Sequence, residues 1–241
     1  MTYGLDAHIH TVASGHHTTD RLIDVVKEAA TRGLFAVGIS EHAAGMRNGC
    51  TESGFRSLLL SPKTRLGVRV LIGAEVNILD DAGRTDLSPA LYKKLDYVIA
   101  SLHKECFSPS EYVKNTKAVI AAMEKGACDV LGHPADGAFP LNIPLVVRAA
   151  KETGVLIEIN EASVKENGYR GDNRAATLEF LRCCKTLSVP VVLGSDSHGR
   201  ADVGNFSVSE ALLRAVDFPA ALVANDSAEK FLALLPRNKR S

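Results

Sequence analysis

The sequence has little of what a nucleic-acid-binding protein needs. It has no tryptophan, only five tyrosines and eight phenylalanines, and its 28 basic residues are balanced by 28 acidic ones. Proteins that bind nucleic acid combine an excess of basic side chains with aromatic side chains that stack on bases. The single basic run, residues 237–240, is expected to be a solvated tail. We therefore expect no nucleic-acid partner.

Features of disulfide-bonded and membrane proteins are also lacking. The five cysteines are odd in number and form no CxxC pair, which favours a reducing compartment over a disulfide framework. No apolar run approaches the roughly 20 residues that cross a bilayer, and the first residues do not resemble a secretion signal. No proline-rich or serine-rich linker divides the chain. We expect a cytoplasmic protein with no membrane partner, in which residues 1–241 form a single domain; whether it is a homo-oligomer stays open.

Strands and helices alternate along the chain. Short apolar segments predict strands at residues 3–8, 34–40, 68–76, 97–102, 129–132, 155–159 and 189–194. Helical periodicity covers residues 19–32, 88–95, 108–125, 142–153, 172–187, 208–216 and 227–235. Residues 45–65 are less regular and are expected to form a long loop with one short helix. The alternation predicts a parallel α/β fold, a barrel or near-barrel.

Seven of the eight histidines lie at or just beyond the ends of these predicted strands. In a barrel of parallel strands all carboxyl ends open on one face, where active sites are built. Neutral imidazole is the commonest metal ligand, so this clustering predicts a metal site. One site can collect His8, His10, His42, Glu75, His103, His133, Asp196 and His198. The spare histidine, His17, is expected in solvent.

Spacing within the first strand supports this site. Residues two apart on a strand point to the same side, so that Asp6, His8 and His10 are expected to face one cavity. Asp6 is expected to orient a ligating histidine rather than to bind metal. Three glycines near the motifs lack the spacing of a phosphate-binding loop and are expected where backbones approach closely: Gly73, Gly132 and Gly194.

Six motifs carry a family resemblance: HIHTVAS, SEH, GAEVN, SLHK, GHP and GSDSH, in this order. As a set they resemble the PHP (polymerase and histidinol phosphatase) family, especially its YcdX-like stand-alone phosphatases. The resemblance runs from residue 5 to about residue 235. It implies a distorted (βα)7 TIM-like barrel that holds a trinuclear metal centre. Zinc is the expected metal, with manganese or iron as alternatives.

The family's metal ligands can be carried over by motif, and none is missing from this chain. The resemblance implies three metal ions, surrounded by these sets: His8, His10, Glu75 and Asp196; Glu75, His103 and His133; and His16, His42 and His198. The chain departs from many relatives at Glu41, where they carry aspartate. We expect the longer carboxylate to orient His42 differently.

The charge of such a centre indicates its substrate. The formal charges of seven neutral imidazoles and two carboxylates sum to about minus two, and three divalent ions contribute about plus six, so that the centre as a whole is positively charged. We therefore expect a small phosphorylated metabolite, a phosphomonoester, hydrolysed by in-line attack of a metal-bridging hydroxide. Glu75 is expected to bridge two metals and Asp196 to position or deprotonate the water, while His198 could protonate the leaving group only if it is not metal-bound.

Substrate contacts are expected near the strand ends. The residues concerned are Ser195, Arg170, Arg174 and Asn160. For the two arginines an ordinary surface position is an equally good interpretation.

Two other functions stay open. Because the resemblance reaches nuclease and polymerase-associated domains, a metal-dependent phosphodiesterase or exonuclease is the enzymatic alternative, and it predicts a preference for diesters. A non-catalytic metal-binding module is the other, and it predicts metal binding without hydrolysis.

Overall fold

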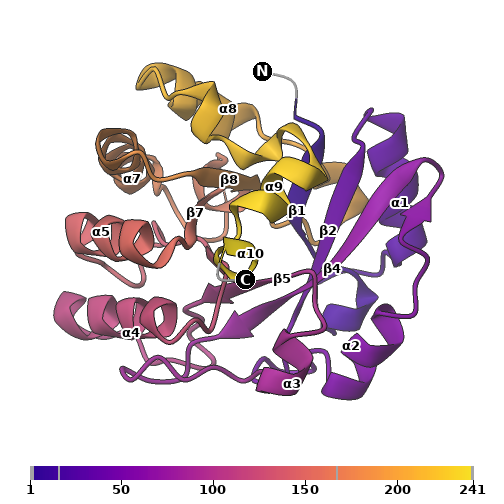
Figure 1. Cartoon of the computed structure of the whole chain (residues 1–241), viewed down its shortest axis with the longest axis horizontal. Helices are drawn as coiled ribbons and strands as arrows, with labels where there is room; N and C mark the ends of the chain where they lie inside the picture. Colours follow the sequence, from indigo (N-terminus) through magenta and orange to yellow (C-terminus); the bar gives the residue numbers. More distant parts are fainter. Residues whose placement is uncertain (1–2, 16, 167, 240–241) are drawn as a thin grey trace.

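Seven parallel strands form a sheet that curves into a nearly closed barrel (Figure 1). The computed structural model describes residues 3–15, 17–166 and 168–239. The strands follow one another in chain order: β1 (Leu5–Ile9), β2 (Ala36–His42), β4 (Val68–Asn77), β5 (Tyr97–Ser101), β6 (Val130–Leu131), β7 (Leu156–Asn160) and β8 (Val191–Gly194). A parallel bridge between Ile9 and Ser197 joins the end of β1 to the segment after β8. The predicted (βα)7 TIM-like barrel in a single α/β domain is confirmed.

Helices surround the barrel (Figure 1). They are α1 (Leu22–Thr31), α2 (Glu52–Leu58), α3 (Pro89–Tyr92), α4 (Tyr112–Glu124), α5 (Ile143–Thr153), α6 (Glu161–Val164), α7 (Arg174–Leu187), α8 (Ser207–Ala215), α9 (Ala228–Leu234) and α10 (Pro236–Lys239). Short 3-10 helices occur at η1 (Val12–Ser14), η2 (Arg200–Asp202), η3 (Ala220–Leu222) and η4 (Ala224–Asp226). Every predicted helical segment contains a helix. In the part of the chain that the structure describes, no helix is long and apolar enough to span a membrane.

The irregular region between β2 and β4 is close to the expected form. It contains one helix, α2, and also a strand that was not predicted, β3 (Thr64–Arg65), which pairs antiparallel with β4. Only two residues long, β3 is too short to show a hydrophobic period.

Local signals explain where helices begin and end, and α5 is an example. The Asn142 side chain accepts the backbone N–H of Leu145 at 3.2 Å, which satisfies one of the free donors at the start of the helix. Gly154 follows the last turn in the left-handed conformation, with φ 78°. The helix therefore stops where the sequence predicts.

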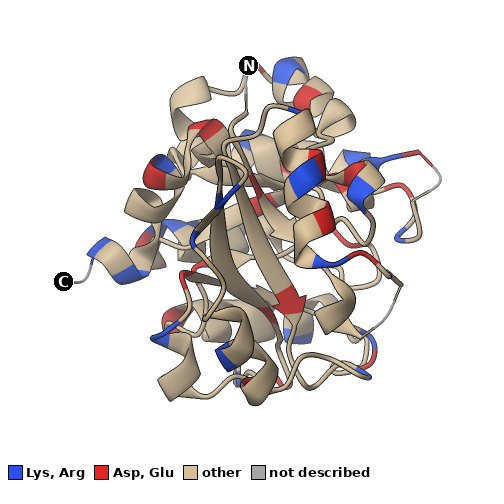
Figure 2. Ribbon diagram, turned by 90° about the vertical axis from the view of Figure 1, so that its right-hand side faces the viewer, with Lys and Arg blue, Asp and Glu red and all other residues tan. Residues whose placement is uncertain are grey.

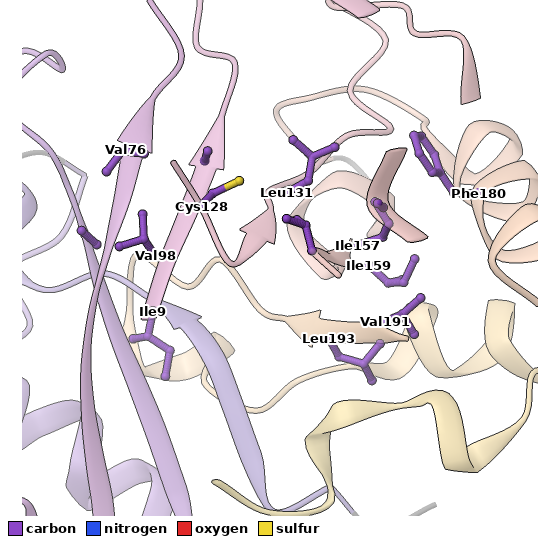
Figure 3. Packing of buried hydrophobic residues seen from close by; sticks show 14 of the residues in the cluster. Ile9, Val76, Val98, Cys128, Leu131, Ile157, Ile159, Phe180, Val191 and Leu193 are labelled. Atoms are coloured by element: carbon purple, nitrogen blue, oxygen red, sulfur yellow. The ribbon is translucent and has the colours of Figure 1, made fainter. Parts of the chain in front are cut away.

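Outward-facing residues of the strands pack against the helices and form the larger apolar core (Figure 3). Val98 of β5, Ile157 of β7 and Phe180 of α7 are buried in this layer. Because side chains alternate along a strand, the remaining residues point into the barrel.

The barrel interior is apolar near the amino ends of the strands. The Tyr97 ring meets Phe231 of α9 edge-on, with 5.2 Å between ring centres. A Cβ on Gly73 would lie 2.5 Å from Tyr97, so only glycine leaves room for this ring. At Gly132 a Cβ would lie 2.2 Å from Ser101 Oγ, which confirms the close approach predicted there. With α9 across the base, the histidines of the strands gather at the opposite end.

The basic run near the C-terminus is not a solvated tail at Arg237. Its guanidinium pairs with the buried Asp129, with Nε 2.9 Å from Oδ1 and Nη2 2.5 Å from Oδ2. It also donates to the carbonyls of Tyr92 at 3.1 Å and Leu95 at 2.7 Å. The prediction was wrong because no local pattern couples Asp129 to a side chain 108 positions later.

Candidate metal centre

Histidines and carboxylates gather at the carboxyl ends of the strands, opposite α9. The buried members of this cluster are His8, His10, His42, Glu75, His103, His133 and Asp196. The His198 side chain is 18% exposed, and His16 lies outside the described residues. His17 is exposed, as expected, and its ring lies 6.1 Å from that of His198.

The Glu75 carboxylate lies at the middle of the cluster. Imidazole nitrogens surround its two oxygens at these distances: from Oε2, His42 Nδ1 at 2.7 Å, His8 Nε2 at 3.4 Å and His10 Nε2 at 3.5 Å; from Oε1, His133 Nε2 at 2.9 Å and His103 Nε2 at 3.3 Å. The Ser101 hydroxyl donates to Oε1 at 2.6 Å and fixes the orientation of the carboxylate.

Several rings are oriented by groups behind them. In each case Nδ1 meets an acceptor: His8 with Glu158 at 2.6 Å, His10 with Ser14 Oγ at 3.0 Å and His103 with Asn77 Oδ1 at 2.6 Å. An acceptor at Nδ1 keeps the ring proton there, so that the Nε2 lone pair is directed into the cluster. His42 differs, because its Nδ1 is the atom that faces Glu75.

Glu41 belongs to one of these supporting networks. Its carboxylate accepts the hydroxyls of Thr11 and Ser14, both at 2.5 Å. Since the Ser14 hydroxyl donates to Glu41, its oxygen accepts from His10 Nδ1 and from the backbone N–H of His42 at 3.1 Å. We expected Glu41 to orient His42; these hydrogen bonds connect its carboxylate to the ring of His10 through Ser14.

Asp6 does not point into the cavity with its neighbours. A register shift within β1 breaks the alternation of side chains. The Asp6 carboxylate accepts the backbone N–H groups of His8 at 3.3 Å, Ser195 at 3.1 Å and Gly204 at 2.8 Å. Burial raises the pKa of Asp6 to about 6. The expected common cavity therefore holds His8 and His10 but not Asp6, which supports the backbone of His8.

Several atoms of the cluster have the surroundings that a cation would complete. Among the described residues, Glu75 Oε2, His103 Nε2 and Asp196 Oδ1 are buried without a hydrogen-bond partner. Leaving such an atom unsatisfied costs about 1–3 kcal/mol. Nitrogen and carboxylate oxygen are also the donor types that zinc takes in proteins. The residues present therefore fit divalent metal ions.

Candidate ligand atoms lie within 4.8 Å of one another in three groups: His10, His42 and His198; His8, His10 and Glu75; and His42, Glu75 and His103. The groups share members, and the third contains His42 where the resemblance implies His133, whose Nε2 lies 2.9 Å from Glu75 Oε1.

Electrostatics in the cluster favour ionised carboxylates beside neutral imidazoles. Burial opposes ionisation of Glu75, but the imidazoles that face it, His103 foremost, hold its pKa well below the usual range. Burial holds the pKa of His10 well below its usual value and lowers the pKa of His103. His8 is the exception, because the charge of Glu158 and other carboxylates outweighs burial and raises its pKa well above normal.

Two candidate ligands have unusual backbone conformations. His133 has φ 27° and Asp196 has φ 53°, in a region that side chains other than glycine rarely adopt. Such strain is concentrated at functional sites. The backbone N–H of His133 donates to Glu158 at 2.6 Å, and that of Asp196 donates to the His8 carbonyl at 2.9 Å. The strained turns are therefore held by groups next to the cluster.

The two arginines expected to bind substrate lie in different surroundings. The Arg170 side chain is 7% exposed, and its guanidinium pairs with Asp196 and, at 3.4 Å, with Asp136. Arg174 lies outside the cluster, with its side chain 49% exposed and paired with Asp172 at 2.7 Å.

The other two expected contacts are buried near the cluster. Asn160 donates to Asp196 Oδ2 at 3.3 Å and to Glu158 Oε2 at 3.2 Å. The Ser195 hydroxyl lies 3.3 Å from the His8 carbonyl oxygen.

Sequence reasoning missed the groups that orient the rings. Glu158 could have been noticed, because it is a carboxylate inside the buried strand segment LIEIN. Ser14 and Asn77 gave no such signal, since small polar residues are common near strand ends.

Comparisons with known proteins are consistent with this geometry. The PHP domain matches residues 6–169. A protein of Clostridium novyi named a probable phosphatase is 39% identical over 235 residues, which cover 98% of this chain and 95% of the relative. Another of that name, from Caldanaerobacter subterraneus, is 40% identical over 237 residues, which cover 98% and 92%.

Solved structures share the fold. A histidinol phosphate phosphatase of Lactococcus lactis, crystallised with zinc, L-histidinol and phosphate, has a TM-score of 0.61 at 16% identity and covers 90% of this chain and 95% of its own. A chain of an archaeal ribonuclease P solved with mature tRNA has a TM-score of 0.57 at 17% identity, with coverages of 98% and 91%. The full-length relatives and the domain match together confirm the resemblance seen in the six motifs: the chain belongs to the PHP domain family.

Proposed function

We propose that this metal-dependent phosphatase hydrolyses a small phosphomonoester at a centre of three divalent metal ions. The surroundings of Glu75 carry the proposal: five imidazole nitrogens face its carboxylate, one oxygen of which has no hydrogen-bond partner among the described residues. Relatives named probable phosphatases support the reaction class. The zinc bound by the Lactococcus neighbour supports zinc here, with manganese or iron as alternatives.

The proposed ligands are the nine residues carried over by motif: His8, His10, His16, His42, Glu75, His103, His133, Asp196 and His198. Divalent metal ions bound there would lower the pKa of a coordinated water to about 7 and polarise phosphoryl oxygens. The strongly positive centre favours an anionic ester of small size.

Asp196 has a different role for each oxygen. Oδ2 is bound by Arg170, whereas Oδ1 lies 3.2 Å from His10 Nε2 and faces the cluster. We assign to Oδ1 metal binding and the positioning of the attacking water. Arg170, beside it, is the proposed phosphate contact, because a guanidinium can exchange a carboxylate for a phosphate oxygen.

The remaining proposed roles belong to residues around the mouth of the barrel, the end at which the strands have their carboxyl ends. His198 is more exposed than Asp196 and is assigned to the side where the leaving group departs. The other proposed substrate contacts are Ser195, Asn160 and, from the outer rim, Arg174. Lys and Arg are interspersed with Asp and Glu in the view of Figure 2, which suits a small substrate better than a long polyanion.

The first experiment compares an aryl phosphomonoester with the matching diester, using zinc-reconstituted protein. We expect faster hydrolysis of the monoester. Faster diester cleavage would favour the phosphodiesterase alternative, and bound zinc with no turnover of either would favour a metal-binding module.

Variants connect the activity to the cluster. Glu75→Ala and His10→Ala should abolish turnover and leave the circular dichroism spectrum largely unchanged. Glu229→Ala removes an exposed carboxylate on α9 and should keep full activity. Near-normal activity in both cluster variants would exclude the proposed centre.

A further inference from the structure

Glu158 lies behind the metal centre, in the middle of β7. It is buried, with 3% of its surface exposed. Oε1 accepts from His8 Nδ1 at 2.6 Å, and Oε2 accepts the backbone N–H of His133, also at 2.6 Å. Asn160 donates to Oε2 at 3.2 Å. One carboxylate therefore holds the ring of one candidate ligand and the backbone of another.

The two residues that Glu158 joins belong to different proposed metals. His8 is assigned to the first ion and His133 to the second, and their rings lie nearly parallel with 6.3 Å between centres. Glu75 contacts both from within the cavity, at 3.4 Å and 2.9 Å. Glu158 contacts both from the opposite side, so the pair is fixed between two carboxylates.

The neighbouring strand leaves space for this carboxylate. A Cβ on Gly194 of β8 would lie 2.0 Å from Glu158 Oε1 and 2.7 Å from His8 Cβ. Any larger residue at Gly194 would displace the hydrogen bond between Glu158 and His8. Close approach at this glycine was predicted, and Glu158 is the group that requires it.

We infer that Glu158 is a positioning residue for two of the three metal ions, an inference that rests on the proposed function. It keeps the His8 proton on Nδ1 and stabilises the strained backbone of His133. Complete loss of the Glu158 carboxylate should weaken the binding of the first and second ions. The binding of the third ion, whose proposed ligands are His16, His42 and His198, should not change.

A glutamine in its place cannot reproduce these contacts. If the amide nitrogen of Glu158→Gln faces His8, that ring must accept at Nδ1 and carry its proton on Nε2, where it no longer offers a lone pair. If the amide nitrogen faces His133, two N–H donors meet. Either orientation removes one of the two supports.

Glu161 provides a matched control directly after the same strand, at the start of α6. It is 2% exposed and accepts the backbone N–H groups of Val208 at 2.9 Å and Ser209 at 2.8 Å, at the start of α8. Glu161→Gln therefore disturbs a buried, multiply bonded carboxylate that supports a helix rather than a proposed ligand.

The test measures zinc affinity by competition with a chelator of known affinity, and zinc content per chain after dialysis. In Glu158→Gln, which keeps one of the two supports, we expect about 10–100-fold weaker binding of one of the two ions and a fall in retained zinc from three ions to two. Glu158→Asp keeps the charge but moves it away from both partners. Its zinc affinity should therefore lie between those of the wild-type protein and Glu158→Gln. Glu161→Gln should retain all three ions. A folded Glu158→Gln protein with wild-type affinity and content, or an equal loss in Glu161→Gln, would overturn the inference.

A second measurement covers the case in which Glu158→Gln does not fold. In zinc-loaded wild-type protein, imidazole ¹⁵N NMR should show His8 with its proton on Nδ1 and zinc on Nε2. Zinc on Nδ1 of His8 would overturn the positioning role. If wild-type protein shows this tautomer and binds three zinc ions but hydrolyses no phosphomonoester, the proposed function fails while the role of Glu158 stands; a wild-type chain that binds no zinc would contradict both.

Discussion

At the scale of single residues, one ring nitrogen of His8, Nε2, can bind either a proton or a metal ion. When no cation is bound, the charge of Glu158 and then of Glu75 outweighs burial and raises the pKa of His8 well above 6.5. A histidine of raised pKa stabilises the folded chain fully below its unfolded value, and this contribution is lost as the pH rises through the folded value. In the proposed centre zinc would take the same Nε2 lone pair, so proton and zinc would compete for it.

We therefore expect zinc loading at pH 7 to release about one proton from His8, with affinity rising as the pH increases from 6 to 8. Calorimetric titration in two buffers of different ionisation enthalpy measures the released protons. Replacement of the exposed His17 by glutamine should leave the count unchanged. Equal apparent enthalpies in the two buffers would show that no proton leaves.

At the scale of elements, the Arg237 side chain attaches α10 to the base of the barrel. Arg237 joins α10 to Asp129, which precedes β6, and its guanidinium lies 4.1 Å from the ring centre of Tyr92 at the end of α3. Its side chain is 15% exposed and that of Asp129 is fully buried. Removing one partner of such a pair leaves an uncompensated charge.

Arg237→Ala should lower the free energy of unfolding by about 3 kcal/mol, because Asp129 stays buried without its partner. Urea denaturation measures the change. Arg214→Ala removes a 63% exposed arginine that pairs with Glu210 and should cost less than about 0.5 kcal/mol. Zinc affinity should not change in either variant, and a loss of zinc in Arg237→Ala would contradict the separation of base and mouth.

At the scale of the whole molecule, the barrel has two ends with different stabilising forces. Apolar side chains and α9 fill the base, whereas polar side chains converge at the mouth. Binding of ions to the folded chain alone adds stability that depends on their concentration. The two contributions come from separate parts of the barrel and should add.

Chelation should lower the melting temperature of the wild-type protein by roughly 10 °C, if loading contributes about 4 kcal/mol and each kcal/mol shifts the midpoint by about 2–4 °C. Differential scanning calorimetry with and without a chelator measures this. Arg237→Ala should lower the midpoint by a similar amount in both conditions. If the substitution lowers the melting temperature of the zinc-loaded protein but not that of the chelated protein, the stabilities of the two ends are coupled.

Much of the fold could be predicted because strand and helix periods are local properties of the sequence. The candidate ligands could be found for the same reason, since histidines such as His42 and His133 follow apolar strands. Partners such as Glu158 and Ser14 could not be assigned, because contacts between side chains distant in sequence depend on how the strands close. The register shift at Asp6 reversed the direction of one side chain, and hydrophobic alternation does not reveal such a shift.

The packing of Tyr97 against Phe231, on the far side of the barrel from the candidate metal ligands, limits the routes by which small molecules can reach the cluster. With the base filled, substrate and both products share one entrance. In the proposed reaction, the alcohol and orthophosphate would leave along the path by which the ester arrived. Orthophosphate that stays bound would occupy the space of the next ester, so the two would compete for the same site.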